Sequence, residues 1–275
     1  MKLIISLPIY ISNELHAEFT EGTVRSIKTS HDHEIILINN YCAPEYLSRM
    51  KALTKVIPNT ENNVSSAWNL GISYGIGRKA DYVLTPNNDL IFRHDAVDNL
   101  VKFACLHPEF VLWTAAEYTD MRTLELHQPD NNFDEHPHFS CFMVSSKFPE
   151  ILKGKEKEIP DEAILKTSKK LNRLLAKPAL GYFDTNFRIA YFEDQDMAHR
   201  IARAGLRAAK TGSALFYHFG SRTIKVDDEL NKANVRNYED NRWYFKEKWG
   251  YDPHQFCPAS EGERLEKSYK NPFNT

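Results

Sequence analysis

The amino-acid sequence predicts an α/β protein with a mostly parallel sheet flanked by helices. Over residues 1–105, short apolar runs bounded by turn residues alternate with segments of helical periodicity, a pattern typical of a parallel sheet. Two apolar or aromatic runs end in clusters of polar side chains, and ligands of open α/β sheets bind where strands end. A chain of 275 residues can form one large domain of this kind, or a domain with a small lobe.

The first half contains three short apolar runs, and we expect strands there: 3–9, 34–38 and 81–85. Between the second and third runs, large apolar side chains recur at near-helical spacing and predict a helix: Leu47, Met50 and Leu53. Further strands are expected at 110–113 and 139–144, separated by a polar loop rich in His, Asp and Asn. Long polar loops in compact domains tend to be functional or mobile.

Residues 153–178 look like an insertion, with an amphipathic helix expected from Asp161. Such a helix is typically a surface helix with one solvated face. The alternative is that it helps to bind an acceptor or a second copy in a homo-oligomer. After residue 225 the chain becomes charged and helical.

Composition excludes several function classes. A net charge of −2, with 42% hydrophobic and 26% charged residues, gives no electrostatic case for a dedicated nucleic-acid binder. The four cysteines are scattered without a Cys-x-x-Cys pair, which argues against zinc ribbons and redox motifs. No signal-peptide layout and no run of about 20 apolar residues occur, so we expect a cytoplasmic protein without a membrane span.

Three carboxylates fall within four positions at Glu193-Asp194-Gln195-Asp196, between an aromatic run and an amphipathic helix. Neighbouring carboxylates repel, so the cluster is unfavourable unless a cation, a proton or a substrate hydroxyl uses it. A structural interpretation is that acidic side chains favour a helix N-terminus. In a catalytic interpretation, adjacent carboxylates split their pKa values and one stays a competent base. Asp196 precedes Arg200 by four residues, which predicts a supporting ion pair.

The run at 81–85 ends in a second polar cluster, Asn87-Asn88-Asp89. An Asp at a strand end, flanked by Asn amides, offers oxygen ligands to Mg²⁺ or Mn²⁺ and leaves room for phosphate oxygens. The alternative is an Asx turn, because Asn and Asp favour turns. Two acidic clusters that each follow an apolar or aromatic run are harder to explain as two turns.

Taken in order, several segments of the chain resemble the nucleotide-sugar glycosyltransferases of family 2, which have the GT-A fold. The matching segments are Leu3–Tyr10, Glu34–Asn40, Asn62–Ile72, Asn87–Asp89, Leu180–Asp184 with Glu193–Asp196, Tyr217–Ser221 and Asn241–Gly250. Each segment alone is a weak or moderate signal, whereas their order and spacing together are specific.

The resemblance implies a GT-A-type, Rossmann-like sheet in one continuous domain with a small acceptor-side insertion. Its parts would be a nucleotide-sugar-binding half at 1–105, an acceptor-binding and catalytic half at 106–224 with the helical insertion at about 153–178, and a C-terminal helical extension at 225–275. The implied activity is metal-dependent transfer of a sugar from a nucleotide diphosphate sugar to an acceptor hydroxyl. Uridine is the favoured base, with dTDP and GDP sugars left open.

The resemblance also assigns roles to individual residues. Nucleotide contacts are expected at Pro8, Tyr10, Asn39, Asn69 and Asn88. Ligands or close contacts of Mn²⁺ or Mg²⁺ are expected at Asp89, Asn87 and His218. Asp194 is the expected general base, with Glu193 second, and a dedicated base on the acceptor side implies inversion at the anomeric carbon.

The chain departs from the family pattern at three asparagines. The family usually has an Asp at or near Asn39 and often at Asn87, and an Asn carries no charge for a metal, so Asp89 is the better metal ligand. Asn63 replaces a family glycine. Because Asn tolerates a positive φ better than most residues, we expect Asn63 to keep that turn.

Two other functions stay open. A sugar-phosphate nucleotidylyltransferase would need a Gly-rich, Arg-containing loop after the first strand, and Pro8–Asn13 has none. A catalytically degenerate nucleotide-sugar-binding protein is favoured by the Asn substitutions. The acceptor also stays open among glycans, small molecules and modified DNA, the last suggested by the lysines near 166–173.

Overall fold

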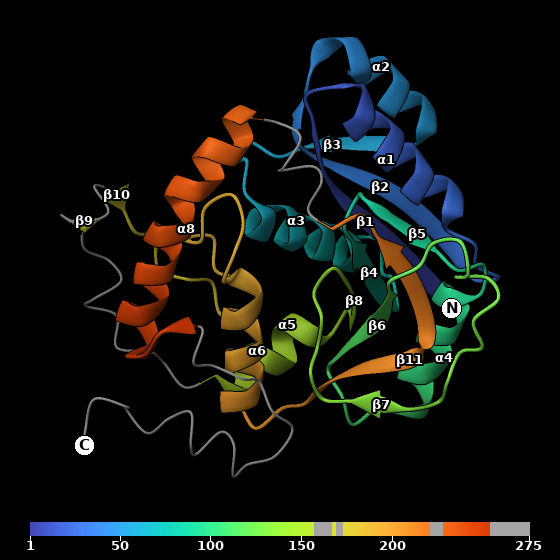
Figure 1. The fold of residues 1–275 in the computed structure, drawn as a ribbon. Coiled ribbons are helices and arrows are strands. Elements are labelled where there is room, and N and C mark those ends of the chain that lie inside the picture. The colour runs from blue at the N-terminus through green and yellow to red at the C-terminus, as the bar shows by residue number, and fades with distance from the viewer. Residues whose placement is uncertain (157–166, 169–172, 221–227, 254–275) are drawn as a thin grey trace.

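The computed structural model describes residues 1–156, 167–168, 173–220 and 228–253. Helices pack on both faces of one central mixed sheet (Figure 1), with strands in the spatial order β3-β2-β1-β4-β8-β6-β11-β5 and β7 paired to β11. The strands are β1 (Lys2–Ile11), β2 (Asp32–Cys42), β3 (Lys55–Pro58), β4 (Tyr82–Pro86), β5 (Leu90–Phe92), β6 (Leu112–Tyr118), β7 (Phe133–Asp134), β8 (Cys141–Ser145) and β11 (Ala208–His218). The helices are α1 (Glu14–Ser26), α2 (Pro44–Leu53), α3 (Val64–Gly77), α4 (Ala96–Leu106), α5 (Phe148–Lys155), α6 (Glu193–Arg203) and α8 (Asp228–Trp249).

The sheet is parallel in the N-terminal half and mixed beyond it. Strands β3, β2, β1 and β4 run parallel, as the alternation of strands and helices predicts. Strand β8 runs antiparallel to both its neighbours, β4 and β6. The chain between β6 and β8 forms no crossover helix, and antiparallel neighbours do not require one.

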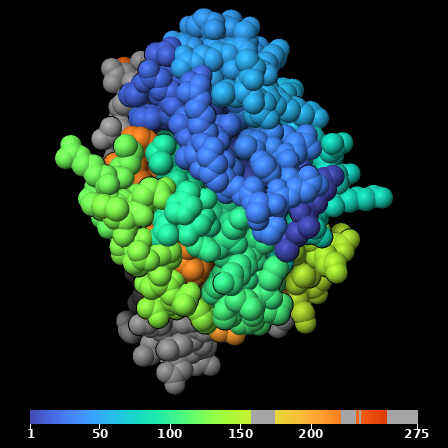
Figure 2. Space-filling model, turned by 90° about the vertical axis from the view of Figure 1, so that its right-hand side faces the viewer, coloured from blue at the N-terminus to red at the C-terminus, as the bar shows by residue number. Residues whose placement is uncertain are grey.

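The strands of the sheet are buried on both faces. In β1, Leu3, Ile5 and Leu7 belong to the cluster under α1, α2 and α4, whereas Ile4 belongs to the cluster under α3, α5, α6 and α8. This division follows from the period of two in a strand. Figure 2 shows the first of these faces, with α1 and α2 in blue at one end and green residues of the central part of the chain at the other.

Helix α3 approaches the sheet closely. A Cβ added at Gly71 would lie 2.1 Å from Ser6 Oγ on β1, and one added at Gly75 would lie 2.3 Å from a methyl of Val83 on β4. The helix begins at an N-cap, Asn63, whose side chain accepts a hydrogen bond from Ser66 N at 3.1 Å. Gly71 and Gly75, on the side of α3 that faces the sheet, therefore allow the helix to pack closely against β1 and β4.

Most expected elements are present. Strands β1, β2 and β4 contain or nearly match the predicted runs, and helix α2 spans the predicted apolar spacing. Strand β8 covers most of the run predicted at 139–144, whereas β6 begins only at Leu112, within the run predicted at 110–113, and extends to Tyr118. Most of the helix expected from Asp161 lies outside the described residues. Of that segment, Thr167–Ser168 and Arg173–Leu174 form a short antiparallel pair, β9 and β10, instead of helix.

The prediction for Asn63 was wrong in detail. Asn63 is extended, with φ −148°, because it serves as the N-cap of α3. The positive φ of this turn, 42°, belongs to its neighbour Asn62. The turn is therefore kept, with the left-handed residue one position earlier.

No helix among the described residues combines the length and the apolar character needed to cross a bilayer.

Candidate active site

A cavity of about 270 Å³ lies where β1 and β4 end, between the start of α6 and the end of β11. Eight of the residues predicted from the sequence line it: Pro8, Tyr10, Asn87, Asn88, Asp89, Glu193, Asp194 and His218. The two acidic clusters, more than a hundred residues apart in the chain, thus face one cavity. Asp89 follows β4 at the carboxyl edge of the sheet, where ligands of open α/β sheets bind. Glu193 and Asp194 begin a helix that follows irregular chain, so their place beside Asp89 depends on how α6 packs.

Asp89 lies in the tight connection between β4 and β5 and is 3% exposed. Strand β5 pairs antiparallel with β11, with His218 opposite Leu90, and this register places His218 Nε2 3.2 Å from Asp89 Oδ1. On the other side of the imidazole ring, Glu117 Oε2 lies 3.4 Å from Nδ1. Burial lowers the pKa of His218, but the contact with Asp89 and the negative charges of both carboxylates outweigh burial and raise it.

Glu117 was not predicted from the sequence. It lies near the end of β6, after the buried run from Leu112 to Ala115, and the pairing of β6 with β11 brings it to His218. The one local signal was an acidic residue near the end of an apolar strand, the same signal that indicated Asp89. The long-range register of β11 was needed to join the two.

The asparagines before Asp89 are held by their own hydrogen bonds. Asn88 Nδ2 donates to Thr20 Oγ1 on α1 at 3.0 Å, and the backbone N–H of Asn87 donates to the carbonyl of Ser140 at 2.8 Å. Both residues line the cavity. The connection that carries Asp89 is therefore fixed from two sides.

A divalent cation at Asp89 and His218 would need further oxygen ligands from outside the protein. Among the described residues, no three His, Cys, Asp or Glu side chains form a complete metal site. Asp89 and His218 offer one carboxylate oxygen and one imidazole nitrogen, and His218 Nε2 is buried without a well-directed hydrogen bond. Mg²⁺ in enzymes is held by one or two carboxylates together with water and substrate phosphates, so a small protein donor set fits.

The first turn of α6 forms another part of the cavity lining. Glu193 is buried at 6% exposed, and its Oε2 has no hydrogen-bond partner among the described residues. Asp194 is partly exposed, and its Oδ1 accepts a hydrogen bond from Gln195 N at 2.7 Å. Burial raises the pKa of Asp194, and burial with the adjacent charge of Asp194 raises the pKa of Glu193 well above its usual value.

The segment leading into α6 has an unusual backbone. Ile189, Tyr191 and Phe192 adopt positive φ values of 60°, 82° and 72°. Each such non-glycine residue costs roughly 1–3 kcal/mol and persists where the surrounding structure determines it. Ile189, Ala190 and Tyr191 line the cavity, so this strained segment forms part of its wall.

An aromatic side chain lines the cavity at the end of β1. Tyr10, near the end of β1, packs against Tyr41 with ring centroids 5.0 Å apart. Asn39 does not line the cavity, whereas its neighbour Asn40 does. The β1–β2 ladder skips Asn40, because Ile9 pairs with Asn39 and Tyr10 with Tyr41. A bulge of this kind re-aims side chains, and sequence periodicity did not reveal it.

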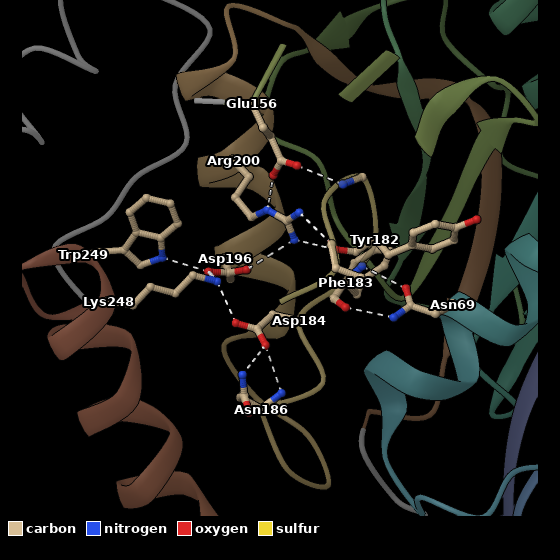
Figure 3. A network of polar contacts seen from close by, with 12 residues as sticks. Asn69, Glu156, Tyr182, Phe183, Asp184, Asn186, Asp196, Arg200, Lys248 and Trp249 are labelled. Atoms are coloured by element: carbon tan, nitrogen blue, oxygen red, sulfur yellow. Dashed lines mark hydrogen bonds and ion pairs between the residues drawn. The ribbon is translucent and has the colours of Figure 1, made fainter. Parts of the chain in front are cut away.

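Asn69 also lies outside the cavity lining. Its Nδ2 donates to the carbonyl of Phe183 at 2.8 Å, and its Oδ1 accepts from the N–H of Phe183 at 2.8 Å. Both ends of the amide are thus engaged in holding the loop after residue 180 against α3 (Figure 3).

Behind the α6 wall lies a buried polar network (Figure 3). Lys248 Nζ from α8 lies 2.7 Å from Asp184 Oδ2 and 2.7 Å from Asp196 Oδ1, and all three side chains are fully buried. Arg200 pairs with Glu156 and lies 3.8 Å from Asp196, which confirms the predicted Asp196–Arg200 ion pair. Three carboxylates thus face two cations, and burial raises the pKa of Asp196.

Comparisons with known proteins agree with this geometry. No curated protein matches the chain. Among solved structures, the fold is similar to that of the mannosyltransferase PcManGT from Pyrobaculum calidifontis in complex with GDP-Man and Mn²⁺, with TM-score 0.53 and 15% identity over 78% of this chain and 56% of the other. It is also similar to residues 1–349 of S. aureus TarS in complex with UDP, with TM-score 0.50 and 11% identity over 79% of this chain and 60% of the other.

This chain therefore spans less than two thirds of each of those two structures. At such low identity the likeness shows the fold, which is the GT-A fold expected from the sequence. A family model described as glycosyl transferase family 2 matches residues 6–162, more than half of the 275 residues. The chain belongs to glycosyl transferase family 2.

Proposed function

We propose that this protein transfers a sugar from a nucleotide diphosphate sugar, with uridine as the base, to an acceptor hydroxyl. The observation that carries the proposal is one cavity lined by both the Asp89–His218 pair and the Glu193–Asp194 pair. Family membership supports the reaction class. The two similar structures are complexes with GDP-Man and Mn²⁺ and with UDP, which supports a nucleotide donor and a divalent cation.

The donor would lie along the ends of β1 and β4. Tyr10, backed by Tyr41, offers an aromatic surface for the base, and Pro8 and Asn40 complete this side of the cavity. Asp89 and His218 would hold Mn²⁺ or Mg²⁺, with Asn87 and Asn88 beside them. A bound cation neutralises the charge that grows on the leaving diphosphate.

Asp194 would accept the proton of the attacking hydroxyl. It is partly exposed to the cavity, and its raised pKa makes it a stronger base than an ordinary carboxylate. Glu193 is the more deeply buried of the two, and burial with the adjacent charge of Asp194 raises its pKa well above its ordinary value. A base on the wall opposite the diphosphate supports direct displacement from that side, and hence inversion at the anomeric carbon.

A panel of nucleotide sugars and nucleoside diphosphates, with and without Mn²⁺, tests the donor and the cation together. The melting temperature should rise with the preferred nucleotide, and more with Mn²⁺, because a ligand that binds the folded state stabilises it. Asp89→Asn should remove the Mn²⁺-dependent part of the rise. Asp32→Asn makes the same chemical change at an exposed carboxylate and should leave the rise intact. A Mn²⁺-dependent rise that survives in Asp89→Asn would refute the metal role.

A non-catalytic nucleotide-sugar-binding protein is the second candidate. The absence of a third His, Cys, Asp or Glu ligand among the described residues favours it. Slow, Mn²⁺-dependent release of nucleoside diphosphate from the bound donor would identify an enzyme. Binding without any release, in the presence of varied acceptors, would identify the binding protein.

A further inference from the structure

Helix α8 lies directly behind the acceptor-side wall, although none of its described residues lines the cavity. Three of its polar side chains follow helical spacing along one face: Asn241, Tyr244 and Lys248. All three are buried, and all three bind segments that lead into or form the start of α6. This face of the helix is therefore engaged with the wall rather than with solvent.

Asn241 holds the strained segment before α6. Its side chain is fully buried; Oδ1 accepts from Arg188 N at 3.0 Å, and Nδ2 lies within hydrogen-bond distance of the carbonyls of Arg188 (2.9 Å), Ala190 (3.0 Å) and Tyr191 (3.3 Å). One amide thus binds four backbone groups of a segment with left-handed residues at Ile189, Tyr191 and Phe192. Three residues after the last of these carbonyls comes Asp194.

Lys248 and Tyr244 attach α8 to the same wall through two further residues, Asp184 and Asp196. Lys248 bridges Asp184 and Asp196, the latter in the first turn of α6, and Tyr244 donates its hydroxyl to Asp184 Oδ2 at 2.7 Å. Trp249 Nε1 donates to Asp196 Oδ1 at 2.8 Å. Both the approach to α6 and its first turn are therefore bound to one rigid helix.

We propose that α8 is a template for the acceptor-side wall, and that Asn241 is a positioning residue that fixes the carboxylate of Asp194 by holding the carbonyls of Arg188, Ala190 and Tyr191. This role rests on the proposed function and deepens it. The donor side is built by β1, β4 and β11, none of which Asn241 contacts through its hydrogen bonds. Loss of Asn241 therefore disturbs transfer and spares nucleotide binding.

The test compares Asn241→Ala with Asn237→Ala. Asn237 lies one turn earlier on α8, and its Nδ2 donates at 2.8 Å to the carbonyl of Ala233 within the same helix. In Asn241→Ala, kcat should fall about a hundredfold, the scale expected when a reacting group is displaced by about 1 Å. The dissociation constant for nucleoside diphosphate with Mn²⁺ should change less than about twofold, and Asn237→Ala should keep both values within about twofold of wild type.

Hydrogen exchange provides a readout that does not depend on activity. Amides of residues 188–194 should exchange faster in Asn241→Ala, because the Arg188 N–H loses its acceptor in that variant. Their exchange rates should be unchanged in Asn237→Ala. If Asn241→Ala folds poorly, Asn241→Ser keeps one short polar group at the position and undergoes the same measurements.

Several results would overturn the proposal. An unchanged kcat in Asn241→Ala would overturn it, whether or not the amides of residues 188–194 exchange faster. An equal loss of nucleotide binding and transfer in both Asn241 variants would show that Asn241 supports the fold as a whole. If the wild-type protein releases no nucleoside diphosphate from any donor, the proposed function fails independently of Asn241. In that case, unchanged hydrogen exchange at residues 188–194 in Asn241→Ala would reject the proposed role of α8 as a template.

Discussion

At the residue scale, the two adjacent carboxylates at the start of α6 differ in their surroundings. Asp194 is partly exposed to the cavity and accepts a hydrogen bond from Gln195 N, whereas Glu193 is buried with one oxygen unpartnered among the described residues. Helical geometry causes the difference, because consecutive residues of a helix point in directions about 100° apart. The geometry thus separates a candidate base from its neighbour.

Asp194→Asn should lower the turnover number about a thousandfold, within the range that a positioned general base supplies. Nucleotide affinity with Mn²⁺ should stay near the wild-type value, because the proposed cation site uses Asp89 and His218 and not Asp194. Steady-state kinetics and calorimetry measure the two quantities. Glu193→Gln is the matched variant and should lose much less activity. The reverse order of effects would move the role of base to Glu193.

The raised pKa of Glu193 predicts a pH-dependent stability difference. A carboxyl whose folded-state pKa lies above its ordinary value of 4.5 binds its proton more tightly in the folded state. Stability from that protonation is present below pH 4.5 and is lost as pH rises through the folded-state pKa. Glu193→Gln does not titrate, so its melting temperature relative to wild type should climb as pH rises from 4.5. A difference that is flat with pH would show that Glu193 titrates normally.

At the element scale, the close approach of α3 to β1 predicts opposite effects at two glycines of one helix. Gly71→Ala places a methyl 2.1 Å from Ser6 Oγ and should destabilise the protein by about 1–3 kcal/mol. Gly77→Ala, at the end of the same helix, meets no atom within 4 Å and should be neutral, or stabilising by up to about 1 kcal/mol. Denaturant unfolding measures both changes. Equal effects at the two positions would contradict the proposed packing.

At the scale of the whole molecule, the buried ion network joins segments more than forty residues apart. Lys248 links α8 to Asp184 and Asp196, and Arg200 links α6 to Glu156 just after α5 (Figure 3). Aromatic side chains of α8, including Tyr244 and Phe245, belong to the same apolar cluster as α3 and α6. Helix α8 is therefore part of one of the two apolar clusters that cover the sheet.

Lys248→Met should destabilise the protein by about 3–5 kcal/mol, because it leaves two carboxylates buried without their cation. Lys246→Met, on the same helix, removes a partly exposed cation 3.8 Å from Asp252 and should change stability by less than about 1 kcal/mol. Urea unfolding of both variants makes the comparison. A stability loss in Lys248→Met no greater than that in Lys246→Met would show that the bridge contributes little.

Strands β3, β5, β7 and β11 were not predicted from the sequence. The sequence by itself indicated β1, β2, β4, β8 and the start of β6, the alternation that makes the N-terminal half parallel, and the two acidic clusters. These depend on local periodicity and on which residues end a strand or begin a helix, so they can be recognised in short stretches of chain. The sequence also predicted site roles for Asp89 and Asp194, and the structure places both residues on one cavity.

Tertiary structure alone decided which neighbours complete that cavity. The bulge in the β1–β2 ladder brings Asn40 instead of Asn39 to the cavity, the loop at Phe183 engages Asn69, and the β6–β11 register adds Glu117 to His218. Tertiary structure also decided that Asn241 of α8 would bind the segment before α6. Each of these contacts depends on strand register or on helix packing between segments that are far apart in the sequence. A short stretch of sequence does not show which distant residue will lie beside it, so such contacts have no local signature.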